Sequence, residues 1–74
     1  MNFTGRNVSI KEIARAIGKS ELFVRFAIKN GYFKFATFIE GKNRTSFYCS
    51  DKKVYEEIGY YNYNYDKKGG INEN

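Results

Sequence analysis

The sequence has no histidine and no proline, and its single cysteine is Cys49. Because a structural zinc site needs about four Cys or His ligands, this chain alone cannot provide one. One cysteine cannot form an intramolecular disulfide, so nothing requires an oxidising compartment. Without histidine or clustered carboxylates, acid–base and metal catalysis lack their usual parts. We therefore expect no enzyme, no catalytic or metal-binding residue and no cofactor, and we expect Cys49 to be a buried strand residue rather than a nucleophile.

Long apolar runs are also missing. The longest are far shorter than the ~20 residues of a membrane-spanning helix, and the N-terminus lacks the apolar segment of a signal peptide. No predicted helix joins a strong apolar face to a basic one, which disfavours a role at a membrane surface. We therefore expect a cytoplasmic protein that does not have a membrane as its partner.

What the sequence does have is positive charge on a short chain. Seventy-four residues allow one small domain, and 13 Lys and Arg against eight Asp and Glu leave a net charge of +5. Such an excess favours a polyanionic partner, nucleic acid before any other. Aromatic residues reach 19%, but Phe and Tyr have AT-rich codons, so their number alone is no evidence for base stacking.

Two short helices are predicted near the start of the chain, after a leader of residues 1–8. Ser9 is typical of a helix N-cap, and Glu12 completes a capping box with it. Gly18 is typical of a helix end, and Ser20 of a second N-cap, for a helix over residues 21–30. The apolar stripe of the first helix consists of Ile10, Ile13, Ala14 and Ile17. The inward side of the second helix consists of Val24, Ala27 and Ile28.

A β-hairpin and a closing helix are predicted next. Residues 32–39 and 45–49 are rich in aromatic and β-branched side chains and flank a polar loop that contains glycine. Ser50 is a third N-cap, and residues 51–58 form a short helix that ends at Gly59. The inward side of this helix is formed by Val54, Tyr55 and Ile58.

The composition changes after Gly59. We therefore divide the chain into a domain of residues 1–59 and a partly flexible C-terminal tail of residues 60–74, rich in Tyr and Asn. The last nine residues are expected to be frayed. The tyrosine run is compatible with an extension of the last helix, packing on the hairpin, a mobile segment or a strand, and its sequence does not decide among these.

The first two helices have the pattern of a helix-turn-helix. This motif needs a small residue where the helices cross, a residue that tolerates positive φ in the turn, and a branched apolar residue that packs back into the angle. Ala14, Gly18 and Val24 meet these demands at the spacing of the motif. An ordinary helical hairpin is the alternative, but the charge and the following hairpin favour DNA binding. The expected fold is α+β, a winged helix-turn-helix with two helices, a two-stranded β-hairpin wing and a short closing helix.

At this point the sequence resembles a known family. The runs SIKEIARAIGKSELFVRFAIKNGY (residues 9–32) and FYCSDKKVYEEIG (residues 47–59) are similar to the small MerR-like, excisionase-like winged-helix domains. Phages, plasmids and integrative elements of low-GC Gram-positive bacteria encode these domains. The resemblance implies that the second helix enters the major groove and that the wing lies over the adjacent minor groove or backbone.

The outer face of the second helix supplies the first set of candidate DNA contacts. Arg25 is the leading one, since its fork can bond guanine or a phosphate. Ser20 and Glu21 lie at the helix start, where they can contact DNA or serve only as the cap and the complement of the helix dipole. Phe26 can contact thymine methyl groups, although packing on the wing or the tail is favoured. The full set is Ser20, Glu21, Leu22, Arg25, Phe26 and Lys29.

The turn and the wing supply the second set, which consists of Lys19, Lys42, Asn43 and Arg44. Arg44 suits a narrow minor groove, where negative potential is concentrated, while a merely solubilising loop fits equally well. Residues 18–50 hold six Lys and Arg against two Glu, which leaves +4 of the total +5. The charge therefore lies on the elements expected to bind DNA.

These observations predict a sequence-directed, double-stranded DNA-binding accessory protein of a mobile element. Two roles fit: an excisionase-like recombination directionality factor, or an accessory factor of conjugative transfer in a relaxosome. Several copies would bind repeated sites, because one small module contacts few base pairs. The implied partners are an integrase or a relaxase, with self-association on DNA through the tail. The alternatives are a small transcriptional regulator and an adaptor that binds protein, not DNA, through its aromatic hairpin and tyrosine run.

Overall fold

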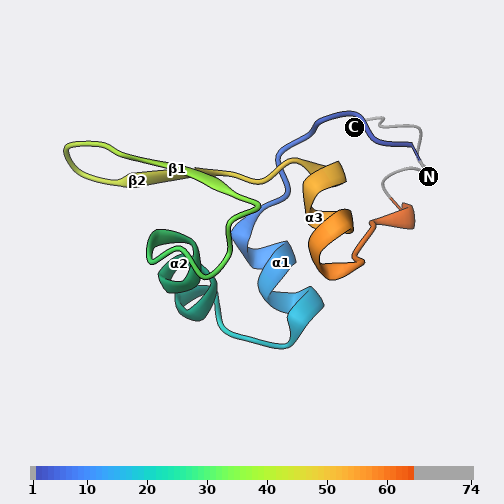
Figure 1. The fold of residues 1–74 in the computed structure, drawn as a ribbon, viewed down its shortest axis with the longest axis horizontal. Helices are drawn as coiled ribbons and strands as arrows, with labels where there is room; N and C mark the ends of the chain where they lie inside the picture. The colour runs from blue at the N-terminus through green and yellow to red at the C-terminus, as the bar shows by residue number, and fades with distance from the viewer. Residues whose placement is uncertain (1, 65–74) are drawn as a thin grey trace.

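The computed structural model describes residues 2–64 of the chain. In this part it is a small α+β domain with three helices and a two-stranded antiparallel sheet. The α+β class is the one that the sequence predicts. The elements are α1 (Ile10–Ile17), α2 (Glu21–Lys29), β1 (Thr37–Glu40), β2 (Thr45–Tyr48) and α3 (Asp51–Ile58). Helix α1 lies between α2 and α3, and the hairpin β1–β2 projects from this helical body past α2 (Figure 1).

All three helices begin where their serines predict. Ser9, Ser20 and Ser50 have extended backbones, and each hydroxyl accepts a bond from the backbone N–H three residues further on. Helices α1 and α3 end at Gly18 and Gly59, which adopt left-handed conformations with φ of 70° and 71°. These ends are set by local chemistry, which is why the sequence predicts them well.

One buried cluster joins the helices, the start of the chain and the end of the hairpin. Its members are Val8, Ile13, Ala14, Val24, Ile28, Cys49 and Val54. The predicted crossing residues Ala14 and Val24 therefore lie in the same core. Cys49 is buried as predicted, but it follows β2 instead of lying in it, and burial raises the pKa of its thiol to about 11. Such a thiol is protonated at neutral pH and is a poor nucleophile.

The predicted hairpin is present, but its first strand is shorter than the sequence indicates. Strands β1 and β2 pair from Thr37↔Tyr48 to Glu40↔Thr45, whereas residues 32–36 have bent and irregular backbone with one turn instead of the predicted strand. Two backbone N–H groups after α2, those of Tyr32 and Phe33, both donate to the carbonyl of Ala27. This closes the end of α2 and turns the chain, so that the rings of Phe33 and Phe35 pack against the core.

The leader of the sequence, described from residue 2 to residue 8, is an integral part of the fold. Val8 is 1% exposed, and its N–H donates to the carbonyl of Cys49 at 2.8 Å. Asn7 forms an isolated antiparallel bridge with Ser50. This N-terminal segment therefore runs beside the connection from β2 to α3 and closes the core on that side (Figure 1).

A buried carboxylate on α3 anchors the same segment. Asp51 is 6% exposed, and its side chain accepts bonds from the backbone N–H groups of Thr4, Gly5 and Lys52 at 2.8–3.0 Å. Burial by itself would raise the pKa of Asp51, but these bonds and the charge of Arg6 outweigh it and hold the pKa below its ordinary value.

A second carboxylate, Glu12 on α1, binds both ends of the described chain. It accepts bonds from the Arg6 guanidinium at 2.8 Å, the Tyr60 hydroxyl at 2.6 Å and the Asn62 amide at 3.3 Å. Burial would raise the pKa of Glu12, but these donors lower it, while burial and the neighbouring carboxylate raise the pKa of Tyr60 to about 12. The carboxylate thus serves these distant partners and not the reciprocal bond of the predicted capping box.

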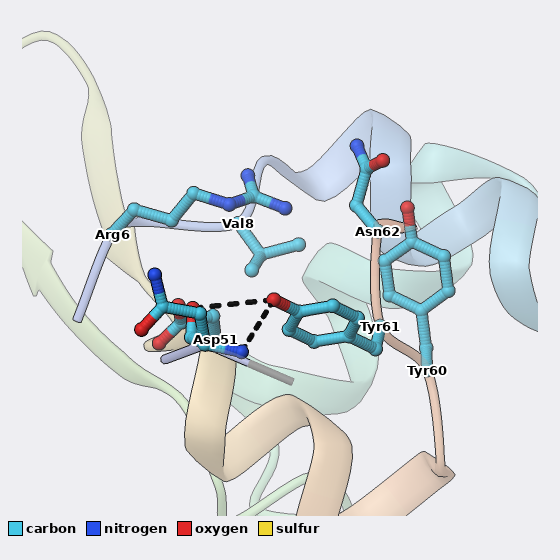
Figure 2. Close-up of a pocket in the computed structure, with 7 residues that line it drawn as sticks. Arg6, Val8, Asp51, Tyr60, Tyr61 and Asn62 are labelled. Carbon is cyan, nitrogen blue, oxygen red and sulfur yellow. Dashed lines mark hydrogen bonds between the residues drawn. The ribbon is translucent and has the colours of Figure 1, made fainter. Parts of the chain in front are cut away.

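The first residues of the predicted tail accordingly pack on the N-terminal segment and α1, and not on the hairpin. Figure 2 shows Arg6, Tyr60, Tyr61 and Asn62 around a cavity of only about 10 Å³, with the Tyr61 hydroxyl bonded to the backbone of Asn2. The frayed end predicted for residues 66–74 lies outside the described residues.

We expect Asp51→Ala to lower the free energy of unfolding by about 2–4 kcal/mol, because three backbone N–H groups would lose a charged acceptor. Urea denaturation at pH 7 measures this loss. Glu57→Ala removes an exposed carboxylate from the same helix and is the matched control, with an expected change below about 0.5 kcal/mol. Similar losses for both variants would contradict the anchoring role of Asp51.

The Asp51 carboxylate should also make the free energy of unfolding depend on pH in the acid range. Because the folded-state pKa of Asp51 lies below its ordinary value of 3.8, its stabilisation is present above that value and is lost as the pH falls through and below it. Asp51→Asn cannot titrate, so its unfolding free energy should fall less between about pH 5 and pH 2 than that of the wild type. Glu12 leaves a residual dependence in both, and identical pH profiles would disprove the expectation.

We expect Gly18→Ala to cost about 1–2 kcal/mol of stability, the usual strain of a left-handed residue with a β-carbon. A β-carbon at this position would have no atom within 4 Å, so steric crowding adds nothing to the backbone strain. Gly18→Asn should cost less, because asparagine tolerates this conformation. Thermal unfolding of the three proteins checks this order, and an alanine variant as stable as the wild type would refute it.

Candidate nucleic-acid interface

Helix α2 buries one face and exposes the other. Val24, Ala27 and Ile28 are buried. On the opposite side Leu22 and Phe26 are 75% and 56% exposed. The hairpin lies beside this helix (Figure 1), and side chains of α2 and β2 line a common space.

Two open grooves occupy that space. The first, which we call the apolar groove, measures about 460 Å³ and is lined by Leu22, Arg25, Phe26, Lys29, Asn30, Thr45 and Phe47. The second, which we call the basic groove, measures about 500 Å³ and lies between β2 and the starts of α1 and α2. Arg25, Thr45 and Phe47 line both grooves, so the two grooves adjoin at these residues.

The basic groove brings together three predicted DNA contacts, and one of them, Glu21 of α2, is acidic. Arg25 comes from α2, and Arg44 from the loop just before β2. Lys11, near the start of α1, lines the same groove, although the sequence did not mark it as a site residue. Its position two residues after the N-cap Ser9, on the polar side of α1, is the signal that could have drawn attention to it.

Most of the predicted cations already have a partner within the domain. Arg25 pairs with Glu21 at 3.2 Å, and Lys29 pairs with Glu40 of β1 at 3.5 Å. The side chains in both pairs are 40–61% exposed. Lys19 lies 5.4 Å from the centre of the Phe23 ring. Exposed pairs of this kind contribute little to stability, so a phosphate can displace the carboxylate at small cost.

The remaining predicted residues have varied positions. The Ser20 hydroxyl caps its own helix by accepting from Phe23, which was one of its two expected roles. Lys42 and Asn43 are exposed in the hairpin loop and line neither groove. The Phe26 ring stacks on Tyr32 at 6.1 Å. Tyr32 lies in the turn after α2, and Phe26 also lines the apolar groove together with Thr45 and Phe47 of β2.

Comparison with protein-family models, curated proteins and solved structures found no match to this chain. Within residues 2–64, no group of three or more Cys, Asp or Glu side chains is placed to hold a metal ion. No helix in that part of the chain is long and apolar enough to cross a membrane.

Double-mutant cycles should show that Arg25 and Lys29 interact only weakly with the carboxylates that they pair with. We expect coupling free energies of about 0.5 kcal/mol or less for Arg25 with Glu21 and for Lys29 with Glu40. The Arg6–Glu12 pair, whose side chains are each 19% exposed, is the internal comparison and should couple more strongly. A coupling above about 1.5 kcal/mol at either exposed pair would mean that the cation is held structurally.

Proposed function

We propose that the protein binds double-stranded DNA, with α2 in the major groove and the hairpin as a wing on the adjacent minor groove. The observation that carries this proposal is the shared basic groove. Arg25 of α2, Arg44 of the hairpin loop and Lys11 of α1 line it together with one acid, Glu21, which pairs with Arg25. One polyanion can therefore meet cations from three elements at once, and a phosphate that binds Arg25 would displace Glu21.

The arrangement of the elements supports this reading. Helices α1 and α2 are joined through the left-handed Gly18, and a projecting hairpin follows, which is compatible with a winged helix-turn-helix. In such a motif the start of the second helix meets base edges while other elements contact the backbone. The +4 net charge of residues 18–50 lies on the elements that would face DNA.

The biological role rests on the resemblance of residues 9–32 and 47–59 to excisionase-like domains. In that role the protein acts in the cytoplasm, without catalysis, as an accessory factor of a mobile element. It would mark or shape repeated DNA sites for an integrase or a relaxase. A small transcriptional regulator would use the same surface, and the identity of the target DNA distinguishes these roles.

A second candidate function is an adaptor that binds another protein. The exposed apolar residues of α2 and the following turn, Leu22, Phe26 and Tyr32, favour it because contiguous apolar surface marks contact sites. DNA binding ranks first because cations from three elements line the basic groove, and one of them, Arg25, also lines the apolar groove beside Leu22 and Phe26.

We expect duplex binding by the full chain to weaken steeply between about 50 and 200 mM salt. Fluorescence anisotropy measures it, first with random duplex and then with duplexes enriched by the protein from a random pool. Arg25→Ala should weaken binding to the enriched duplex by about tenfold, and Arg44→Ala should reduce the salt slope by about 1.

Lys53→Ala is the matched control, because it removes one exposed cation from α3, on the other side of α1 from α2. Lys53→Ala should leave binding nearly unchanged. Equal effects of Lys53→Ala and Arg25→Ala would contradict a specific surface. No binding near about 100 mM salt would move the adaptor function to first place.

A further inference from the structure

Leu22 and Phe26 form an apolar pair at the centre of the outer face of α2. They are one turn apart and 75% and 56% exposed, and Phe26 stacks on Tyr32 to extend the surface. Beyond Phe26 lies a further hollow of about 310 Å³, lined by Phe23, Phe26, Ala27, Tyr32 and Phe33. Single exposed apolar side chains are ordinary, but a contiguous group on one helix face marks a contact surface.

The surroundings of this pair are basic. Arg25 and Lys29 line the apolar groove together with Leu22 and Phe26. Both cations sit in exposed, exchangeable ion pairs. A partner that fits must therefore offer negative charge at the rim and an apolar group at the centre. A DNA duplex does so at thymine, because its C5-methyl is the apolar group that bases display in the major groove.

We propose that Leu22 and Phe26 select thymine by packing against its methyl groups, an inference that rests on the proposed DNA binding. Neither side chain has a hydrogen-bond donor or acceptor. Against guanine or cytosine they would exclude water from polar base edges without replacing its bonds, which disfavours those bases. Their separation along α2 is about 6 Å, so the selected thymines lie within about two base-pair steps of 3.4 Å.

The test removes single methyl groups from the DNA. A duplex enriched by the full-length chain is resynthesised with deoxyuridine in place of one thymidine at a time, which deletes only the methyl group. We expect affinity to fall about fourfold at one or two positions, the factor for one buried methyl group. With a C·G pair at such a position, 5-methylcytosine should bind more tightly than cytosine.

Protein variants then assign the contacts. Leu22→Ala and Phe26→Ala should each abolish the uridine effect at one position while leaving the salt slope unchanged. Tyr63→Ala removes a side chain that is 64% exposed and belongs neither to α2 nor to the hairpin. It is the matched control, with the uridine effect retained. Circular dichroism verifies folding, and the uridine scan of the wild type decides the question even where a variant does not fold.

The possible failures are distinguishable. Binding that is salt-dependent and sensitive to Arg25→Ala, but insensitive to uridine at every position, overturns thymine selection and leaves the proposed function standing. Absence of duplex binding overturns both. A uridine scan unchanged in both variants, together with loss of a dimer by Phe26→Ala in sedimentation, overturns the inference and assigns this face to a second copy of the chain.

Discussion

The anchoring of the N-terminal segment by Asp51 is the constraint on which the rest of the domain depends. A chain of this size buries few large side chains. Hydrogen bonds must therefore hold those segments that the small core does not fix by packing. Asp51 holds the backbone at Thr4 and Gly5, which brings Val8 into the core beside Cys49 and Val54. The helical body against which α2 packs is thereby complete, and the outer face of α2, with Leu22 and Phe26, stays exposed.

The outer face of α2 carries two kinds of side chain, cationic and apolar. The cations Arg25 and Lys29 are held loosely by carboxylates that a phosphate can replace. Leu22 and Phe26 carry no charge and cannot respond to phosphate at all. In the proposed complex with DNA, attraction to the duplex and discrimination among its sequences would therefore fall to different residues of the same helix, as backbone contacts and base contacts divide in DNA recognition.

The features predicted from the sequence were those set by neighbours in the chain. Serine caps and glycine ends act within one turn of helix, so the helix bounds followed directly. In the sequence, Asp51 looks like an ordinary acidic residue in the first turn of a helix. The residues around it give no sign that the backbone of Thr4 and Gly5 will bind it. Glu12 fits a capping box, yet partners 48 and 50 residues away occupy it. The start of β1 and the place of Lys11 likewise depend on packing between distant segments.

The bond between Asn2 and the Tyr61 hydroxyl has a consequence for where the chain enters and leaves the domain. The two ends of the described chain meet beside α3, on the far side of α1 from α2 (Figure 1). The chain therefore enters and leaves residues 2–64 on one side of the domain, and the surface that α2 and the hairpin present lies on the other side.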